Sequence, residues 1–243
     1  LYLASGSKLQ TIGVYAFRDC TGLTGTLTIP ANVTSIGSFA FYECSELTGL
    51  GFASGSKLRT IGDYAFCGTS LTGALTIPSR VTTIGDYAFS SCEGLTSLTF
   101  AGTQLRTIGD SAFSSCSGLA GTLTLPLGVT TIGEDAFRWC ENLGAELTIP
   151  ASVTSIGNDA FYGCTGLTEV QIYSEAIIKQ LDSDTAAGCV AYYAQYLMLN
   201  ADVPDSEVPR GLLDYFTLVW SGGGTLWYDA YERHYTSSYH PTV

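Results

Sequence analysis

The sequence predicts a solenoid of the α/β type, in which short parallel strands and connecting turns stack along one axis. Three observations predict it: a motif that recurs about every 24 residues, an alternating apolar and polar stretch in each copy, and an apolar face in each copy that a single copy has no means to bury. Such repeats bury their apolar faces by stacking on one another, so a continuous core is expected along the stack.

The recurring motif is an Ile-Gly pair with Ala-Phe three residues after the glycine. A cysteine lies three residues after the phenylalanine in six of seven copies, but the third copy has Cys67 directly after Phe66. Leu181, Ala186 and Cys189 keep the spacing and predict a degenerate eighth copy. The seven clear copies begin at Ile12, Ile36, Ile61, Ile84, Ile108, Ile132 and Ile156.

The residues from Leu123 onward show which structure each part of one repeat is expected to form. Leu123–Leu125 alternates apolar and polar residues, as a half-buried strand does, and Pro126 ends the strand because proline lacks an amide hydrogen. Ile132 returns the chain to the core, Gly133 permits a turn, and Glu134 takes the N-cap position of a short helical turn that carries Ala-Phe inward. The equivalent cap positions hold Asp63, Asp86, Asp110 and Asn158.

The consensus L-x-x-x-L-x-I-P-x-x-V-x-x-I-G-x-x-A-F-x-x-C-x-x-L resembles the BspA-type, or Treponema pallidum-type, leucine-rich repeat over about residues 1–170. The resemblance implies a right-handed superhelix with a parallel β-sheet on its concave face and short helical turns or loops opposite. It also implies an exported or surface-attached protein that adheres to host cells, matrix proteins or other microbes.

Two parts are predicted along the chain: a solenoid over residues 1–189, and an aromatic-rich cap or small module over residues 190–243. Val190–Ala201 has the periodicity of a short helix. Leu212–Trp220 and Thr225–Tyr231 flank a glycine run and are expected to pair as a hairpin. A cap that closes the open end of the solenoid is favoured over a separate ligand-binding module.

Composition narrows the class of partner. Acidic residues outnumber basic ones 22 to 10, which disfavours nucleic acid and anionic membranes as partners. No apolar run approaches the roughly 20 residues that a membrane-spanning helix needs. Residues 1–9 match the pattern of residues 50–58, so the chain begins inside a repeat and we expect an upstream segment, with an export signal as one candidate.

The eight cysteines are expected to be free thiols, with no metal and no cofactor. Equivalent residues on stacked turns lie about 4.8 Å apart with parallel Cβ vectors, whereas a disulfide prefers converging Cβ atoms about 3.8 Å apart. There is no C-x-x-C motif, and a catalytic Ser-His-Asp or Cys-His set would depend on His234 or His240 near the end of the chain. We therefore predict no catalysis.

The outward positions of the predicted strands are the candidate binding site. They are small and neutral toward the N-terminus and acidic toward the C-terminus, which favours a basic or calcium-bridged partner; a merely solvated surface is the alternative. The threonine columns also raised ice binding, but threonine is common at exposed strand positions. The candidate residues are Thr28, Thr76, Ser97, Thr99, Thr124, Glu146, Thr148, Glu169 and Gln171.

A second column holds aromatic residues in the first four repeats and is expected to cover the turn side of the core; a binding stripe there is the less favoured reading. Its members are Tyr15, Phe39, Tyr64 and Tyr87.

The sequence therefore predicts an extracellular or cell-surface protein that mediates protein–protein interaction or adhesion. The expected partner is a host or neighbouring-cell surface or matrix protein. A passive spacer that presents another module is the alternative, and an enzyme ranks third.

Overall fold

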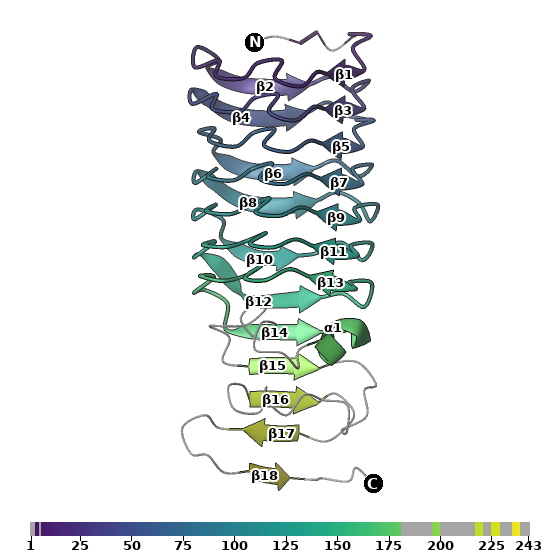
Figure 1. Ribbon diagram of the computed structural model, residues 1–243, viewed down its shortest axis with the longest axis vertical. Coiled ribbons are helices and arrows are strands. Elements are labelled where there is room, and N and C mark those ends of the chain that lie inside the picture. Colours follow the sequence, from purple (N-terminus) through teal and green to yellow (C-terminus); the bar gives the residue numbers. More distant parts are fainter. Residues whose placement is uncertain are drawn as a thin grey trace.

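The computed structural model describes residues 3–4 and 6–180, together with four later strands. Figure 1 shows the turns stacked along one axis as a nearly straight column, with the N-terminus at one end. This arrangement confirms the predicted solenoid. The four later strands are β15 (Tyr196–Leu199), β16 (Thr217–Trp220), β17 (Thr225–Tyr228) and β18 (Tyr235–Ser238).

One side of the stack is a parallel sheet of seven strands, each two residues long. Every strand ends in the isoleucine of the Ile-Gly motif, and each isoleucine pairs with that of the next turn. Six of these seven isoleucines are buried and the last is partly buried, so they form one column of the core. The strands are β1 (Thr11–Ile12), β3 (Ser35–Ile36), β5 (Thr60–Ile61), β7 (Thr83–Ile84), β9 (Thr107–Ile108), β11 (Thr131–Ile132) and β13 (Ser155–Ile156).

The second side carries longer strands, also parallel. Its pairing is interrupted twice: β2 pairs with β4, β6 pairs with β8, and β10 starts a run through β12, β14, β15 and β16. In β2 the side chains of Leu27 and Ile29 are buried while Thr26 and Thr28 are exposed, which is the predicted alternation. The strands are β2 (Gly25–Ile29), β4 (Leu47–Phe52), β6 (Gly73–Ile77), β8 (Leu95–Phe100), β10 (Gly121–Thr124), β12 (Leu143–Ile149) and β14 (Glu169–Ile172).

A column of phenylalanines fills the middle of the solenoid. Neighbouring rings are nearly parallel, at 5–9°, with centroids 5.1–5.3 Å apart. Offset-stacked rings at this separation attract one another beyond the area they bury. The repeat length therefore places each ring on the one before it. The column consists of Phe17, Phe41, Phe66, Phe89, Phe113, Phe137 and Phe161.

The segments that carry Ala-Phe inward are turns rather than helical turns, so the predicted N-caps are wrong. Among the residues that the structure describes, the single helix is α1 (Glu175–Gln180). The amide of Ala16 bonds within its own turn to Gly13, whereas the amides of Tyr15 and Phe17 bond to the following turn. Tyr15 and its equivalents have a φ of 53–59°, which an α-helix does not tolerate. The equivalents are Phe39, Tyr64, Tyr87, Ser111, Asp135 and Asp159.

The glycine after each isoleucine provides room rather than a special backbone angle. A Cβ atom at Gly109 would lie 2.5 Å from the Asp86 carboxylate and 2.6 Å from the carbonyl carbon of Gly85. Positive φ occurs at other positions of the repeat and not at Gly109. The preceding turn packs so closely here that it leaves no room for a side chain.

The seven described cysteines are free thiols, as predicted, and five of them are buried; Cys20 and Cys67 are half-buried, and Cys189 lies outside the described residues. The thiol of Cys116 donates to the carbonyl of Phe89 in the preceding turn, at 3.1 Å. In the irregular third repeat, Thr69 takes the cysteine position, and its hydroxyl donates to the carbonyl of Phe66 at 2.8 Å. Both side chains are small and donate to a phenylalanine carbonyl, but Cys116 bonds to the preceding turn and Thr69 bonds within its own turn.

The long sheet continues past residue 189, because β15 and β16 extend it in parallel. β15 lies within the predicted helix Val190–Ala201, so four of those residues form a strand instead. β17 pairs antiparallel with β18, and it also contacts β16, so the expected hairpin between the segments that contain β16 and β17 stays a prediction. The rest of both segments lies outside the described residues, and the division at residue 189 stays a prediction.

Replacing Phe113 with alanine should lower the free energy of unfolding by about 3–5 kcal/mol, because Phe113 is fully buried between two rings. Phe17 is partly exposed at the end of the column and gives a matched control, with a clearly smaller loss expected for Phe17→Ala. Urea unfolding measures both. Equal losses would contradict a ring column that is tightest at its centre.

The buried thiols predict that stability falls at alkaline pH. Burial raises the pKa of Cys92 and of Cys164 from 9.0 to about 12. In the unfolded chain these thiols ionise near pH 9, so their contribution to stability is fully present below pH 9 and is lost as the pH rises toward 12. Urea unfolding across this range should show the decline, and Cys92→Ser should make it shallower. An unchanged slope in that variant would contradict the assignment.

Candidate protein-binding surface

The predicted binding residues do point outward from the long strands. Thr76 of β6 pairs with Thr99 of β8, and Thr124 of β10 pairs with Thr148 of β12, so their side chains form short rows along the stack. Thr28 is exposed and pairs with Gly51, which has no side chain to continue the row. We call this surface the strand face, and it consists of Thr28, Thr76, Ser97, Thr99, Thr124, Glu146, Thr148, Glu169 and Gln171.

The acidic end of the strand face is an assembled cluster. Glu146 of β12 pairs directly with Glu169 of β14. The side-chain amide of Gln171 donates to both carboxylates, at 2.9 Å each. The hydroxyl of Tyr173 donates to the side-chain Oε1 of Gln171 at 3.4 Å. Two carboxylates on adjacent strands, held by one amide, offer a fixed anionic group to a partner.

The strand face is not continuous, a feature that the sequence pattern does not predict. Because β4 does not pair with β6 and β8 does not pair with β10, two breaks divide it into three segments. Thr28 lies before the first break, Thr76 and Thr99 lie between the breaks, and Thr124 lies after the second. A hollow of about 600 Å³ opens at each break.

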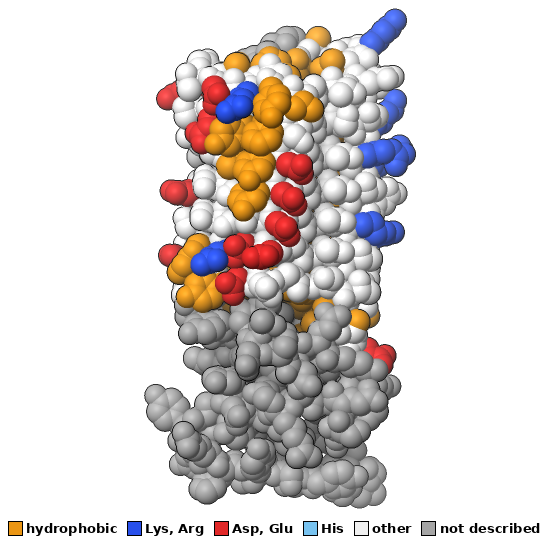
Figure 2. All heavy atoms as spheres, in the orientation of Figure 1, with side chains coloured by type: hydrophobic (Ala, Val, Ile, Leu, Met, Phe, Trp, Pro, Cys, Tyr) orange, Lys and Arg blue, Asp and Glu red, His pale blue; other side chains and the backbone are white. Residues whose placement is uncertain are grey.

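The aromatic column lies on the surface of the turn side, where Phe39 and Tyr64 are half-buried and Tyr15 and Tyr87 are exposed (Figure 2, orange). Tyr15, Phe39, Tyr64 and Tyr87 stack with centroids 4.6–5.1 Å apart. The guanidinium of Arg18 lies 5.5 Å from the ring of Tyr15 and forms an ion pair with Asp19 at 3.1 Å. Tyr15 is 52% exposed, so this stripe is accessible at its N-terminal end.

A smaller aromatic group lies further along the stack. The Arg138 guanidinium is 5.1 Å from the ring of Tyr162 and 5.7 Å from that of Trp139. It also pairs with Asp135 at 3.0 Å and with Asp159 at 3.6 Å. Arg138 is therefore neutralised by its neighbours and fixed in place.

The acidic residues that were expected to cap helical turns instead link successive turns. A carboxylate oxygen of Asp63 accepts from the amide of Asp86 at 3.1 Å, and one of Asp86 accepts from the amide of Asp110 at 2.9 Å. Asp110 accepts in the same way from Glu134, at 2.8 Å. These side chains form a column of like charge on the surface (Figure 2, red).

Within the described part of the chain, no three His, Cys, Asp or Glu side chains gather closely enough to hold a metal ion. No helix among those residues is long and apolar enough to cross a membrane. His234 and His240 lie outside the described residues.

The stacked turns, the buried columns and the parallel sheets define a repeat-solenoid protein. The family model described as the BspA type leucine rich repeat region, in six copies, matches residues 3–120 and 130–192. The chain belongs to this family. Its fold is consistent with a role in protein–protein interaction.

Solved structures of bacterial leucine-rich repeat proteins are similar. One from Bacteroides ovatus is 25% identical with a TM-score of 0.44, over 79% of this chain and 59% of that protein. One from T. pallidum is 27% identical with a TM-score of 0.47, over 70% and 68%. The pneumococcal vaccine antigen PcpA is 20% identical with a TM-score of 0.40, over 84% and 63%. The chain thus spans less than two thirds of the Bacteroides and pneumococcal proteins, and no curated protein matches it.

The hydrogen bonds that the aspartate side chains accept from the following turn are expected to stabilise the stack. Asp86→Ala removes the acceptor of the Asp110 amide and should lower the free energy of unfolding by about 1 kcal/mol. Asp86→Asn keeps an acceptor oxygen and removes one of several like charges, so its effect should stay within about 0.5 kcal/mol. Thermal and urea unfolding compare the two. If the asparagine variant loses as much as the alanine variant, the charge and not the hydrogen bond is what matters.

Proposed function

We propose that this chain is part of an exported or cell-surface protein that binds another protein through its strand face and carries out no catalysis. The observation that carries the proposal is the carboxylate pair of the exposed Glu146 and the half-buried Glu169, which Gln171 holds in place at the end of the strand face. A fixed group loses little side-chain entropy on binding, so it favours specific recognition.

The partner is expected to present a basic group, and a host or neighbouring-cell surface or matrix protein fits an exported adhesin. Membership of the BspA-type leucine-rich repeat family supports a binding role, since leucine-rich repeat proteins generally act without catalysis. The neutral rows around Thr76, Thr99 and Thr124 would supply shape and hydrogen bonds, while the carboxylates would supply orientation.

The test is binding of the immobilised chain to a panel of extracellular-matrix and cell-surface proteins. We expect a saturable protein hit, and Glu146→Gln/Glu169→Gln should weaken it about tenfold. Glu93→Gln/Glu141→Gln is the matched control, because it removes two exposed carboxylates outside the strand face. The control should bind like the unmodified chain.

Three outcomes count against the proposal. Equal weakening in both double variants would assign the effect to net charge. A hit that neither variant weakens would place the binding site elsewhere. The absence of any saturable hit would favour a passive spacer that presents another module.

A further inference from the structure

The cations of the solenoid are segregated. Residues 6–172 contain seven basic residues. Four of them lie on connections that lead from a long strand to the next short strand, and a fifth lies on the equivalent segment before β1. These connections contain no aspartate or glutamate, although the chain has a net charge of −12. Figure 2 shows these basic side chains in blue along one edge. We call this surface the basic edge, and it consists of Lys8, Lys57, Arg59, Arg80 and Arg106.

The cations of the basic edge have no anionic partner among the described residues. Arg18 and Arg138, on the acidic and aromatic side, are both in ion pairs. In contrast, Lys57 donates to the neutral side chain of Asn32, and Arg106 donates to backbone carbonyls, including that of Gly128 at 2.8 Å. All five are exposed, so their charge faces solvent.

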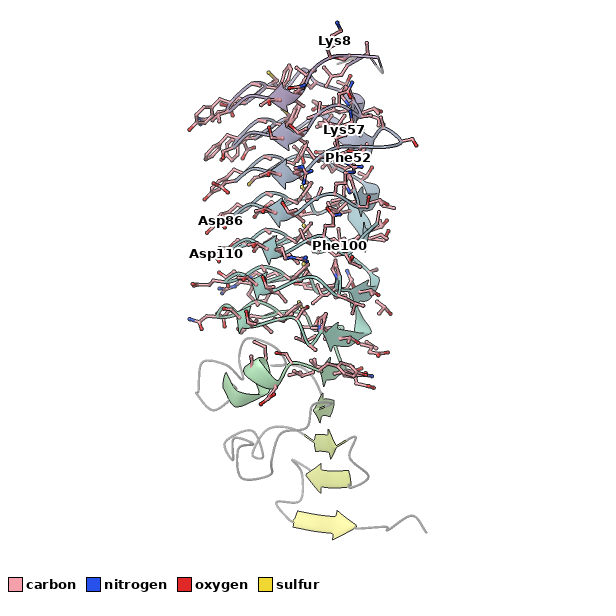
Figure 3. All side chains as sticks on the ribbon, turned by 90° about the vertical axis from the view of Figure 1, so that its right-hand side faces the viewer. Lys8, Phe52, Lys57, Asp86, Phe100 and Asp110 are labelled. Carbon is pink, nitrogen blue, oxygen red and sulfur yellow. The ribbon has the colours of Figure 1, made fainter. Side chains whose placement is uncertain are left out.

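The two hollows open beside this edge. Phe52 and Arg80 line the first, and Phe100 holds in the second the position that Phe52 holds in the first. Figure 3 shows Lys57, Phe52 and Phe100 on one side of the stack, with Asp86 and Asp110 on the opposite side. The hollows are two repeats apart, or about 10 Å at the spacing of stacked strands.

The sequence explains why the sheet opens at these places. Ala53 donates its amide to Ile29 at 3.0 Å, but the next turn has Pro78 at this position, which has no amide hydrogen to donate to Phe52. Eight residues separate Phe52 from Ile61, whereas six separate Ile77 from Ile84, so the two connections do not lie in register. Proline alone does not open the sheet, because Pro150 follows β12 and β12 still pairs with β10.

The turns stay bonded on both sides of the first opening. The amide of Thr72 donates to Thr48 at 2.9 Å, and that of Thr82 donates to Arg59 at 2.8 Å. Between these bonds β4 and β6 do not pair, so strand-edge polar groups face the hollow. Each hollow therefore combines a partly buried phenyl ring with polar backbone edges. Arg80 lines the first hollow, and Arg106 donates to the carbonyl of Thr103, which lines the second, at 3.2 Å.

We propose that the basic edge binds a sulfated polysaccharide, which runs along the stack and passes over both hollows. Sulfate groups repeat along such a polymer and would meet the row of cations. Sugar hydroxyls would bond to the strand edges and to the serine and threonine hydroxyls of the connections. The apolar faces of sugar rings would lie on Phe52 and Phe100. This site is distinct from the strand-face carboxylates, and it takes the opposite charge.

The probe is heparin, with binding to the full chain measured by calorimetry at low and at physiological salt. Saturable binding that weakens with salt is expected. Arg59→Gln/Arg80→Gln should weaken it about tenfold. The control Arg18→Gln/Arg138→Gln removes the same charge from the opposite side and should bind within about twofold of the unmodified chain. Circular dichroism checks that each variant is folded.

Poly-glutamate and double-stranded DNA serve as competing probes. If either binds as tightly as heparin and is lost in Arg59→Gln/Arg80→Gln, the edge recognises acidic peptides or nucleic acid, and the polysaccharide assignment is overturned. Equal weakening in both double variants, or no heparin binding by the unmodified chain, also overturns it. Loss of protein binding in Glu146→Gln/Glu169→Gln leaves this proposal unaffected, because the two sites are separate.

Discussion

From Phe17 to Phe137, the amide of each phenylalanine in the ring column donates to the carbonyl of the alanine in the following turn, at 2.7–2.8 Å. This bond fixes the pitch of the stack on the turn side, where there is no conventional strand pairing. The bond requires the turns to lie close together. The residue before each phenylalanine is therefore the small alanine, and Gly109 has no room for a Cβ atom. The ring column and the thiol column follow from the same spacing.

One consequence is that surface chemistry comes in columns. Residues at the same position of successive repeats lie one turn apart, so carboxylates, aromatic rings and cations each form a separate column on the surface. The carboxylate of Asp86 offsets its like-charged neighbours by accepting the next turn's amide, and Arg18 lies against the aromatic stripe. The cations of the basic edge form no ion pair with a described carboxylate, which distinguishes them from Arg18 and Arg138.

Much of this structure could be predicted from the sequence. The periodicity of Ile132, Phe137 and Cys140 predicts three buried columns, and the alternation around Thr124 predicts an outward row. The sequence predicts the wrong turn geometry because Asp or Asn, which follows the glycine in most repeats, is also what a helix N-cap prefers. The breaks in the sheet were missed because strands on both sides of a break show the same alternation. Their signals were Pro78 and the longer connection after Phe52, whose effect depends on which turn lies next to which.

Native-state hydrogen exchange of the Phe89, Phe113 and Phe137 amides tests the central claim most directly. If the inter-turn bonds hold the stack together, these amides should exchange only through global unfolding, with the free energy of unfolding that urea gives. Exchange of these amides with little protection, while the strand amides remain protected, would contradict the account. The stack would then be held by its sheets alone.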